Sequence, residues 1–281
     1  MLNPSRMALG LVATVALASG AAAAQKKEFR YNIGPGASIS VVNDFGPVTL
    51  RAATGSQVVV VATPRSSKVQ VESAQYGNRV DVRSHSAPGA KPDERRVDYD
   101  IQVPPDANVM VRSSTGPVKV QGLNGDLSLE GDNSPIEVRD TNGQVHARTV
   151  GAPITLTNLH HGHVEASSVS GQVTLNNVSG NVVTVNTTAG PITFSGECDG
   201  GGQYSLSSHS GTIDVSLSAS ASVDVSARSV TGSVEDNFPL KPLARANTAL
   251  DQGKSFAGTS NTGASSLRLR TFSGKIRVKK Q

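Results

Sequence analysis

The sequence predicts an all-β protein, and more specifically a β-solenoid whose coils contain about 18–21 residues each. The first observation is a short motif of small and apolar residues that recurs along the chain at nearly constant spacing. The second is a composition that suits a thin interior: aromatic residues make up 4% of the 281 residues, Trp is absent, and Gly occurs 28 times. The abundant Val, Ile and Leu argue against a disordered chain.

Residues 1–24 have the pattern of a secretory signal peptide. Arg6 supplies the positive start, residues 7–18 form the apolar centre, and Ala22 and Ala24 provide a small-x-small cleavage site. The apolar run is too short to span a membrane, and no later apolar stretch approaches 18 residues. We therefore expect an exported chain, periplasmic or at the cell surface or outside the cell, with no transmembrane span after the signal is removed.

A five-residue motif begins each expected coil: a small residue, a variable residue, an apolar residue, a polar residue and a second apolar residue. Gly190-Pro191-Ile192-Thr193-Phe194 is one copy, and an early copy begins at Gly46. The steps between successive small residues are 18, 18, 19, 19, 21, 21 and 42. The small residues are Gly116, Ser134, Ala152, Gly171, Gly190, Gly211, Gly232 and Gly274.

A second apolar pair lies seven and five residues before each small residue, as in Val145 and Ala147 before Ala152. Each coil therefore carries two short strands, and such repeats bury their apolar faces only by stacking, about 4.8 Å apart. We expect the small residues at corners, where Gly can adopt positive φ. An outer-membrane barrel is excluded because its strands need about 9–11 residues, whereas the strands expected here have about five. An immunoglobulin-like sandwich does not predict the fixed repeat.

The regular repeat occupies residues 106–281, after an N-terminal β region at 25–105 that contains the first coil and hairpin-like strands. Residues 237–262 interrupt the repeat and are expected to form a protruding loop. The last coil is basic, and we expect it to be the open end of the solenoid, where basic side chains prevent pairing with another chain. The alternative is a surface site for an anionic envelope polymer, such as lipopolysaccharide or peptidoglycan. The candidates for that site are Arg268, Arg270, Lys275, Arg277 and Lys279.

His146, His163 and Glu165 are the weak candidates for a metal site. They are expected on the outer side of adjacent coils, and imidazole and carboxylate groups suit zinc. Outward residues of a solenoid stack by default, however, and no ligand-spacing signature is met. A solvated polar stack is the favoured interpretation, so neither a metal nor another cofactor is expected. The single cysteine, Cys198, is expected to be a buried apolar residue.

Three other function classes find little support in the sequence. The net charge of +4, without basic runs interleaved with aromatics, argues against nucleic acid as a partner. A ladder of Thr155, Thr174 and Thr193 would suit an ordered surface such as ice, but threonine also favours exposed strands for its own sake. A carbohydrate-active β-helix enzyme remains the alternative function. Its candidate acidic face comprises Asp126, Glu130, Asp132, Glu137, Arg139 and Asp140.

The extended segment from Val97 to Pro104, the Ser114–Val118 stretch and the recurring Ser-x-x-Gly coils, such as Ser168 to Leu175, together resemble a known family. It is a widespread bacterial family of unknown function named "putative adhesin", and the resemblance covers residues 38–280. The resemblance implies an exported β-solenoid and transfers no catalytic residues. The leading hypothesis is a non-catalytic adhesin or cell-envelope binding or scaffold protein. Its partner would be an envelope glycan or a protein surface.

Overall fold

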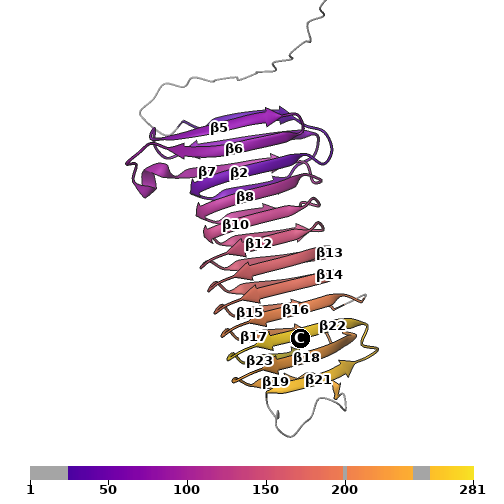
Figure 1. Cartoon of the computed structure of the whole chain (residues 1–281). Coiled ribbons are helices and arrows are strands. Elements are labelled where there is room, and N and C mark those ends of the chain that lie inside the picture. The colour runs from indigo at the N-terminus through magenta and orange to yellow at the C-terminus, as the bar shows by residue number, and fades with distance from the viewer. Residues whose placement is uncertain (1–24, 199–200, 243–253) are drawn as a thin grey trace, which may run out of the picture.

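The computed structural model describes residues 25–198, 201–242 and 254–281, so the expected signal peptide lies outside the described residues. The described chain forms 23 strands that wind into a single stack, and the predicted β-solenoid is confirmed (Figure 1). A 3₁₀ turn, η1 (Pro92–Arg95), interrupts the strands near the N-terminal end. Within the described residues, no helix is long and apolar enough to cross a membrane.

Each coil contributes one strand to each of two sheets, called sheet 1 and sheet 2 here. Sheet 1 contains, in spatial order, β5 (Val69–Tyr76), β6 (Arg79–Ser86), β2 (Ser38–Phe45), β8 (Asn108–Thr115), β10 (Leu127–Asn133), β12 (Val145–Thr149), the second halves of β13 (Ile154–Ser168) and β14 (Val173–Thr187), β16 (Gln203–Ser208), β22 (Ser265–Thr271), β18 (Val223–Ser229), β21 (Ser255–Ser260) and β20 (Lys241–Pro242).

Sheet 2 lies across the core from sheet 1. It contains β1 (Lys27–Asn32), β4 (Gln57–Pro64), β7 (Val97–Val103), β3 (Val48–Ala52), β9 (Val118–Gln121), β11 (Ile136–Thr141), the first halves of β13 and β14, β15 (Ile192–Gly196), β17 (Ile213–Leu217), β23 (Ile276–Lys280) and β19 (Val234–Asn237). Strands of successive coils pair in parallel, and antiparallel pairs occur only toward the two ends of the described stack.

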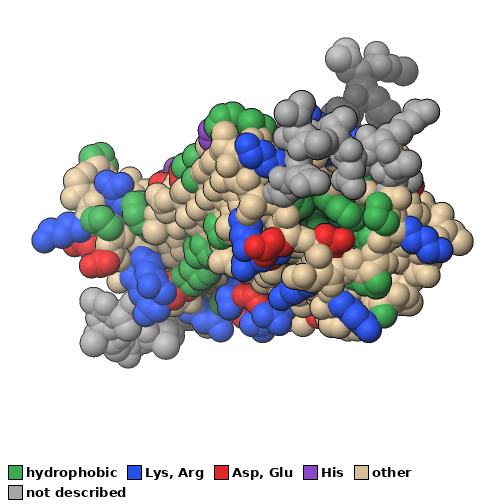
Figure 2. All heavy atoms as spheres, turned by 90° about the horizontal axis from the view of Figure 1, so that it is seen from below, with side chains coloured by type: hydrophobic (Ala, Val, Ile, Leu, Met, Phe, Trp, Pro, Cys, Tyr) green, Lys and Arg blue, Asp and Glu red, His purple; other side chains and the backbone are tan. Residues whose placement is uncertain are grey.

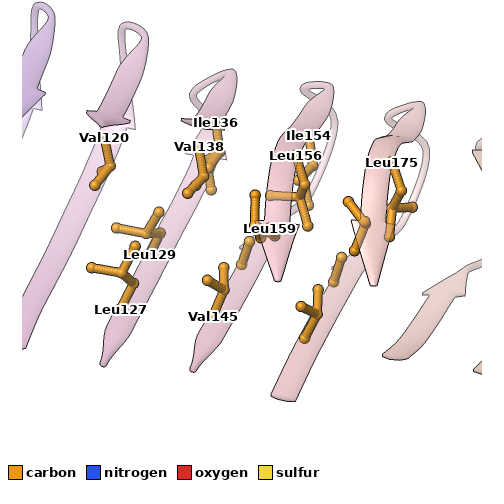
Figure 3. Close-up of a cluster of buried hydrophobic side chains, with 14 of the residues drawn as sticks. Val120, Leu127, Leu129, Ile136, Val138, Val145, Ile154, Leu156, Leu159 and Leu175 are labelled. Carbon is orange, nitrogen blue, oxygen red and sulfur yellow. The ribbon is translucent and has the colours of Figure 1, made fainter. Parts of the chain in front are cut away.

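The core is a set of apolar columns that run along the solenoid axis. Ile136 pairs in register with Val118 on one side and Ile154 on the other, and all three side chains are buried. Figure 3 shows the same arrangement for the inward side chains of sheets 1 and 2. Because complete burial of a Val, Leu or Ile side chain contributes about 1.5–3 kcal/mol, these columns hold the coils together. Cys198 is also buried in this core, as expected.

The small residues lie at the expected corner. For most of them, however, a positive φ does not explain why a small residue is needed there. Gly46 and Gly116 have φ values of 112° and 121°, whereas Gly190 does not adopt positive φ. A Cβ atom on Gly190 would instead collide with the backbone oxygen of Gly171 in the neighbouring coil. A small residue is needed here because two coils turn in close contact.

Buried hydroxyl groups three residues before the small residue close the same corner. Thr187 Oγ1 donates a hydrogen bond of 2.7 Å to the carbonyl oxygen of Gly190. In a later coil, the backbone N–H of Gly211 donates to Ser208 Oγ at 2.8 Å. A backbone group that is buried without a partner costs about 1–3 kcal/mol. The recurring Ser-x-x-Gly pattern is therefore a hydrogen-bonded turn.

The coils do not stack in the order of the sequence. The C-terminal strands β22 and β23 lie between earlier coils: β22 pairs with β16 and β18, and β23 pairs with β17 and β19. The C-terminus is accordingly seen within the stack in Figure 1. The expectation that the basic C-terminal coil is the open end is therefore wrong. The coil of β18 and β19 occupies the end, and β21 covers it by antiparallel pairing with β18.

The segment at 237–262, expected to be a protruding loop, contains the strands β20 and β21; its residues 243–253 lie outside the described residues. A similar displacement occurs at the N-terminal end. There β2 lies between β6 and β8, and β3 lies between β7 and β9. The hairpin of β5 and β6 covers that end of sheet 1. At both ends, an antiparallel strand reverses the chain, and this reversal lets a sequence-distant coil enter the stack.

Candidate functional site

The outer face of sheet 1 carries two open furrows near the middle and N-terminal part of the solenoid. Furrow 1 has a volume of about 470 Å³, and furrow 2 has a volume of about 430 Å³. Furrow 1 is lined by Ser38, Asn108, Val109, Met110, Asp126, Leu127, Ser128, Gln144, Val145, His146, His163 and Glu165. Furrow 2 is lined by Val42, Asp44, Arg112, Ser113, Ser114, Glu130, Gly131, Asp132, Arg148, Thr149 and Val150.

The strand register determines which side chains meet in furrow 1. Ser128 pairs with Met110 on one side and His146 on the other, and His146 pairs with Glu165. Alternate residues of a strand face the same side, so these four side chains form an outward column with a spacing of about 4.8 Å. The furrow therefore offers one contact for each coil along the axis.

The three candidate metal ligands lie in furrow 1. His146 Nδ1 is 3.3 Å from Glu165 Oε2, with both side chains nearly half exposed, and His163 lines the furrow two residues before Glu165. These residues do not assemble into a metal site: within the part of the chain that the structure describes, no group of three or more His, Cys, Asp or Glu side chains could hold an ion. The pair contributes a polar, hydrogen-bonding patch to the floor of the furrow.

Furrow 2 carries alternating charges along the axis. Arg112 Nε is 3.0 Å from Glu130 Oε2, and Arg148 is the register neighbour of Glu130 on the following coil. Asp44 and Asp132 line the same furrow. Exposed pairs of this kind contribute only about 0–1 kcal/mol to stability. Their charged groups are therefore available for contacts with a polar ligand.

The acidic residues considered for polysaccharide cleavage do not share one face. Asp126, Glu130 and Asp132 belong to the coil segment of sheet 1, whereas Glu137 and Arg139 belong to β11 in sheet 2. Burial raises the pKa of Glu137, but hydrogen bonds from Arg139 and Lys119 outweigh burial and hold that pKa below its usual value. A general acid needs the opposite shift, so this carboxylate is unsuited to the role.

The candidate basic site is divided between the two sheets. Arg268 and Arg270 are on β22 in sheet 1, whereas Arg277 and Lys279 are on β23 in sheet 2, where Lys275 precedes the strand. Arg277 Nη2 is 2.7 Å from Asp214 Oδ2, and Lys275 pairs with Glu235. Figure 2 shows Lys and Arg side chains spread around this end of the molecule. The five residues therefore do not form one site.

Sequence reasoning missed Arg228, which is the register neighbour of Arg270 on β18. The two residues are 42 positions apart in the chain. A stack in sequence order would place Arg228 beside Ser207, because β18 would then follow β16. Instead, β22 lies between β16 and β18 and places Arg270 beside Ser207. Arg228 and Arg270 share a column because each precedes its small residue, Gly232 or Gly274, by four positions.

Comparisons with known proteins found similar solved structures and a matching family model. A solved structure named as a putative adhesin from Bacteroides fragilis is 12% identical, covers 92% of this chain and 98% of its own, and has a TM-score of 0.50. A structure named as a putative cell adhesion protein from Clostridium sporogenes is 13% identical over 92% of this chain and 100% of its own, with a TM-score of 0.28. No curated protein matches the chain. The family model of Toastrack DUF4097 matches residues 37–279, so the chain belongs to the Toastrack DUF4097 family.

Proposed function

We propose that this protein is an exported, non-catalytic β-solenoid that binds an extended component of the cell envelope, either a glycan or a protein surface. The observation that carries the proposal is the pair of furrows on the outer face of sheet 1. Each furrow is lined by polar side chains from several successive coils in register. The ligand expected there is a polymer that runs along the solenoid axis.

Two further points support a binding role. The sequence pattern of residues 1–24 is that of an export signal, which would deliver the chain to the envelope. A protein with the same fold, from Bacteroides fragilis, is named as a putative adhesin. The furrows are open and lined by hydroxyl, amide, imidazole and carboxylate groups, which suit many weak contacts spread along a chain.

A bulky side chain in furrow 1 tests the proposal. Ser128 is half-buried in the outward column, and Ser128→Trp would fill the space between Met110 and His146. The matched control is Thr174→Trp, which places the same side chain at a half-buried outward position of β14 in sheet 2. Binding is measured by pulldown with envelope fractions and on a glycan array, with circular dichroism to verify folding.

We expect Ser128→Trp to weaken binding at least about tenfold, which corresponds to about 1.4 kcal/mol, and Thr174→Trp to bind like the unmodified protein. Equal binding by both variants would show that furrow 1 is not the site. Cleavage of a polysaccharide without stable binding would overturn the proposal in favour of a carbohydrate-active enzyme.

A further inference from the structure

One corner of the solenoid, next to sheet 1, carries an exposed apolar ridge. The structure describes six large hydrophobic side chains that are exposed, and four of them lie here, each 46–51% exposed. Two exposed polar side chains, Thr188 and His209, lie in the middle of the row, with two apolar side chains on each side. The corner ridge consists, in spatial order, of Val150, Val169, Thr188, His209, Phe272 and Val230.

Backbone hydrogen bonds between neighbouring coils make the corner ridge continuous. Phe272 N donates to the oxygen of His209 at 3.0 Å, and Thr231 N donates to the oxygen of Phe272 at 2.7 Å. The rings of His209 and Phe272 stack, with centroids 5.0 Å apart and an interplanar angle of 3°. The residues that follow along each corner are small or hydroxylated, such as Ala189 and Ser210. The ridge therefore protrudes from its surroundings.

Arginines flank the corner ridge on its sheet 1 side. Arg148, Arg270 and Arg228 each precede a ridge residue by two positions and are exposed on the outer face. Arg270 and Arg228 are register neighbours, and Arg268 faces outward two residues before Arg270. Like charges directly opposite one another on adjacent strands are unfavourable. This cluster is nevertheless adjacent to serine hydroxyls, at Ser205, Ser207 and Ser226, instead of carboxylates.

None of Arg228, Arg268 and Arg270 forms an ion pair with another described residue, although Arg277 and Lys275 in sheet 2 both do. Unbalanced guanidinium groups of this kind favour an anionic ligand, because each can donate two parallel hydrogen bonds to phosphate oxygens. A partner that contacts both the arginines and the exposed apolar ridge would need an anionic part and an apolar part.

We propose that the corner ridge and the arginines beside it form a contact surface for a membrane that contains anionic phospholipid. The proposal goes beyond the proposed function, since it adds a lipid surface as a second partner at a site apart from furrow 1. The apolar ridge enters the boundary between headgroups and acyl chains, while Arg228, Arg268 and Arg270 bind headgroup phosphates. A soluble anionic glycan would satisfy the arginines but leave Phe272 and Val230 exposed to water.

The absence of Trp from the sequence allows a direct test with a single fluorescent reporter. Phe272→Trp places the reporter on the corner ridge, and Tyr76→Trp places it at a 67% exposed position on β5, at the other end of the molecule. We expect emission of Phe272→Trp to shift to shorter wavelength with phosphatidylglycerol-containing vesicles and not with phosphatidylcholine vesicles. No shift, or an equal shift for Tyr76→Trp, would overturn the proposal.

Charge removal provides a second test by vesicle flotation. Arg228→Gln and Arg270→Gln are each expected to weaken binding to phosphatidylglycerol-containing vesicles about fivefold. Arg51→Gln is the matched control, because Arg51 is exposed on β3 in sheet 2 and forms no ion pair with a described residue. Equal loss in all three variants would overturn the proposal, since any positive charge would then suffice.

Two outcomes separate this inference from the proposed function. If a soluble polyanion such as heparin binds the unmodified protein and Phe272→Ser equally, and vesicles bind neither, the arginines recognise a glycan and the lipid proposal is wrong. Ser128→Trp should still float with anionic vesicles, because furrow 1 lies away from Phe272 and Arg228. Loss of envelope-polymer binding in Ser128→Trp with flotation retained would support both proposals independently.

Discussion

Gly190 illustrates how a single residue position determines whether two coils can stack. Its equivalents along the corner include Ser134 and Ala152 as well as glycines, so a side chain is tolerated in some coils. At Gly190 a Cβ atom would collide with the backbone oxygen of Gly171. A backbone oxygen held between two stacked coils cannot move away as a flexible side chain can. The cost of a methyl group should therefore differ sharply between neighbouring corners.

Gly190→Ala is expected to destabilise the protein by about 1–3 kcal/mol or more, as overpacking does in well-packed interiors. Gly151→Ala is the control, because a Cβ atom there meets only the side chains of Asn133 and Ser170. Thermal unfolding followed by circular dichroism measures both. A similar melting temperature for the two variants would contradict the steric explanation.

A ladder of hydrogen-bonded side chains also links successive coils at another corner of the solenoid. Asp140, Asn158 and Asn177 all adopt φ values of 53–55°, in the left-handed region that Asn and Asp tolerate better than most residues. Asn158 Nδ2 donates to Asp140 Oδ1 at 2.9 Å, and Asn177 Nδ2 donates to Asn158 Oδ1 at 3.0 Å. Asn or Asp suits this corner for two reasons: it tolerates the left-handed backbone conformation, and its side chain forms the hydrogen bond to the neighbouring coil.

At the scale of elements, β19 shows how a terminal strand differs from an interior one. Its Asp236 occupies an inward register position beside Val278, where interior coils have Val, Leu or Phe. Burial raises the pKa of Asp236, and the hydrogen bond that Phe238 N donates to Oδ1 at 3.0 Å offsets only part of that effect. An acid whose pKa is raised on folding stabilises the fold below its unfolded pKa, and this contribution is lost as pH rises through the folded pKa.

Asp236→Asn should therefore raise the melting temperature at pH 7 and have little effect well below the unfolded pKa of an aspartate. The amide oxygen can still accept the hydrogen bond from Phe238. Because the side chain is only partly buried, we expect a gain of no more than about 2–4 °C, which is what 1 kcal/mol gives in a chain of this size. Asp93→Asn on the exposed η1 turn is the control. An equal gain at acidic and neutral pH would contradict this reasoning.

At the scale of the whole molecule, the order of the coils links the C-terminus to the middle of the stack. The pair β22 and β23 separates the coil of β16 and β17 from the coil of β18 and β19. In a solenoid stacked in sequence order, the last coil would contact one neighbour only. Here it contacts two, so its removal should disconnect the coil beyond it.

A chain that lacks residues 265–281 is expected to lose hydrogen-exchange protection in β18 and β19, while β13 and β14 keep theirs. Adding the missing segment as a peptide should restore protection, because the gap between β16 and β18 is the size of one coil. A chain that lacks only Gln281 is the control. Retained protection of β18 in the truncated chain would show that this coil can pair directly with β16.

The coil length, the inward columns, the polar outer faces and the corner positions can all be predicted from the sequence, because each depends on a local pattern that repeats. It also indicated that His146, His163 and Glu165 would face outward from adjacent coils. It did not determine the order of the terminal coils. Every coil contributes similar inward Val, Ile and Leu side chains, so the apolar pattern is compatible with pairing between any two coils.

The order of the coils depends on the antiparallel strand pairs at the two ends of the stack, β5 with β6 and β18 with β21. That order placed Phe272 beside His209, Arg270 beside Ser207, and Arg277 between Asp214 and Glu235. The repeat places these residues in shared columns, because they have equal offsets from the small residues of their coils, but it does not say which coil lies next to which. They meet because the last coil pairs with β16 and β17 on one side and with β18 and β19 on the other.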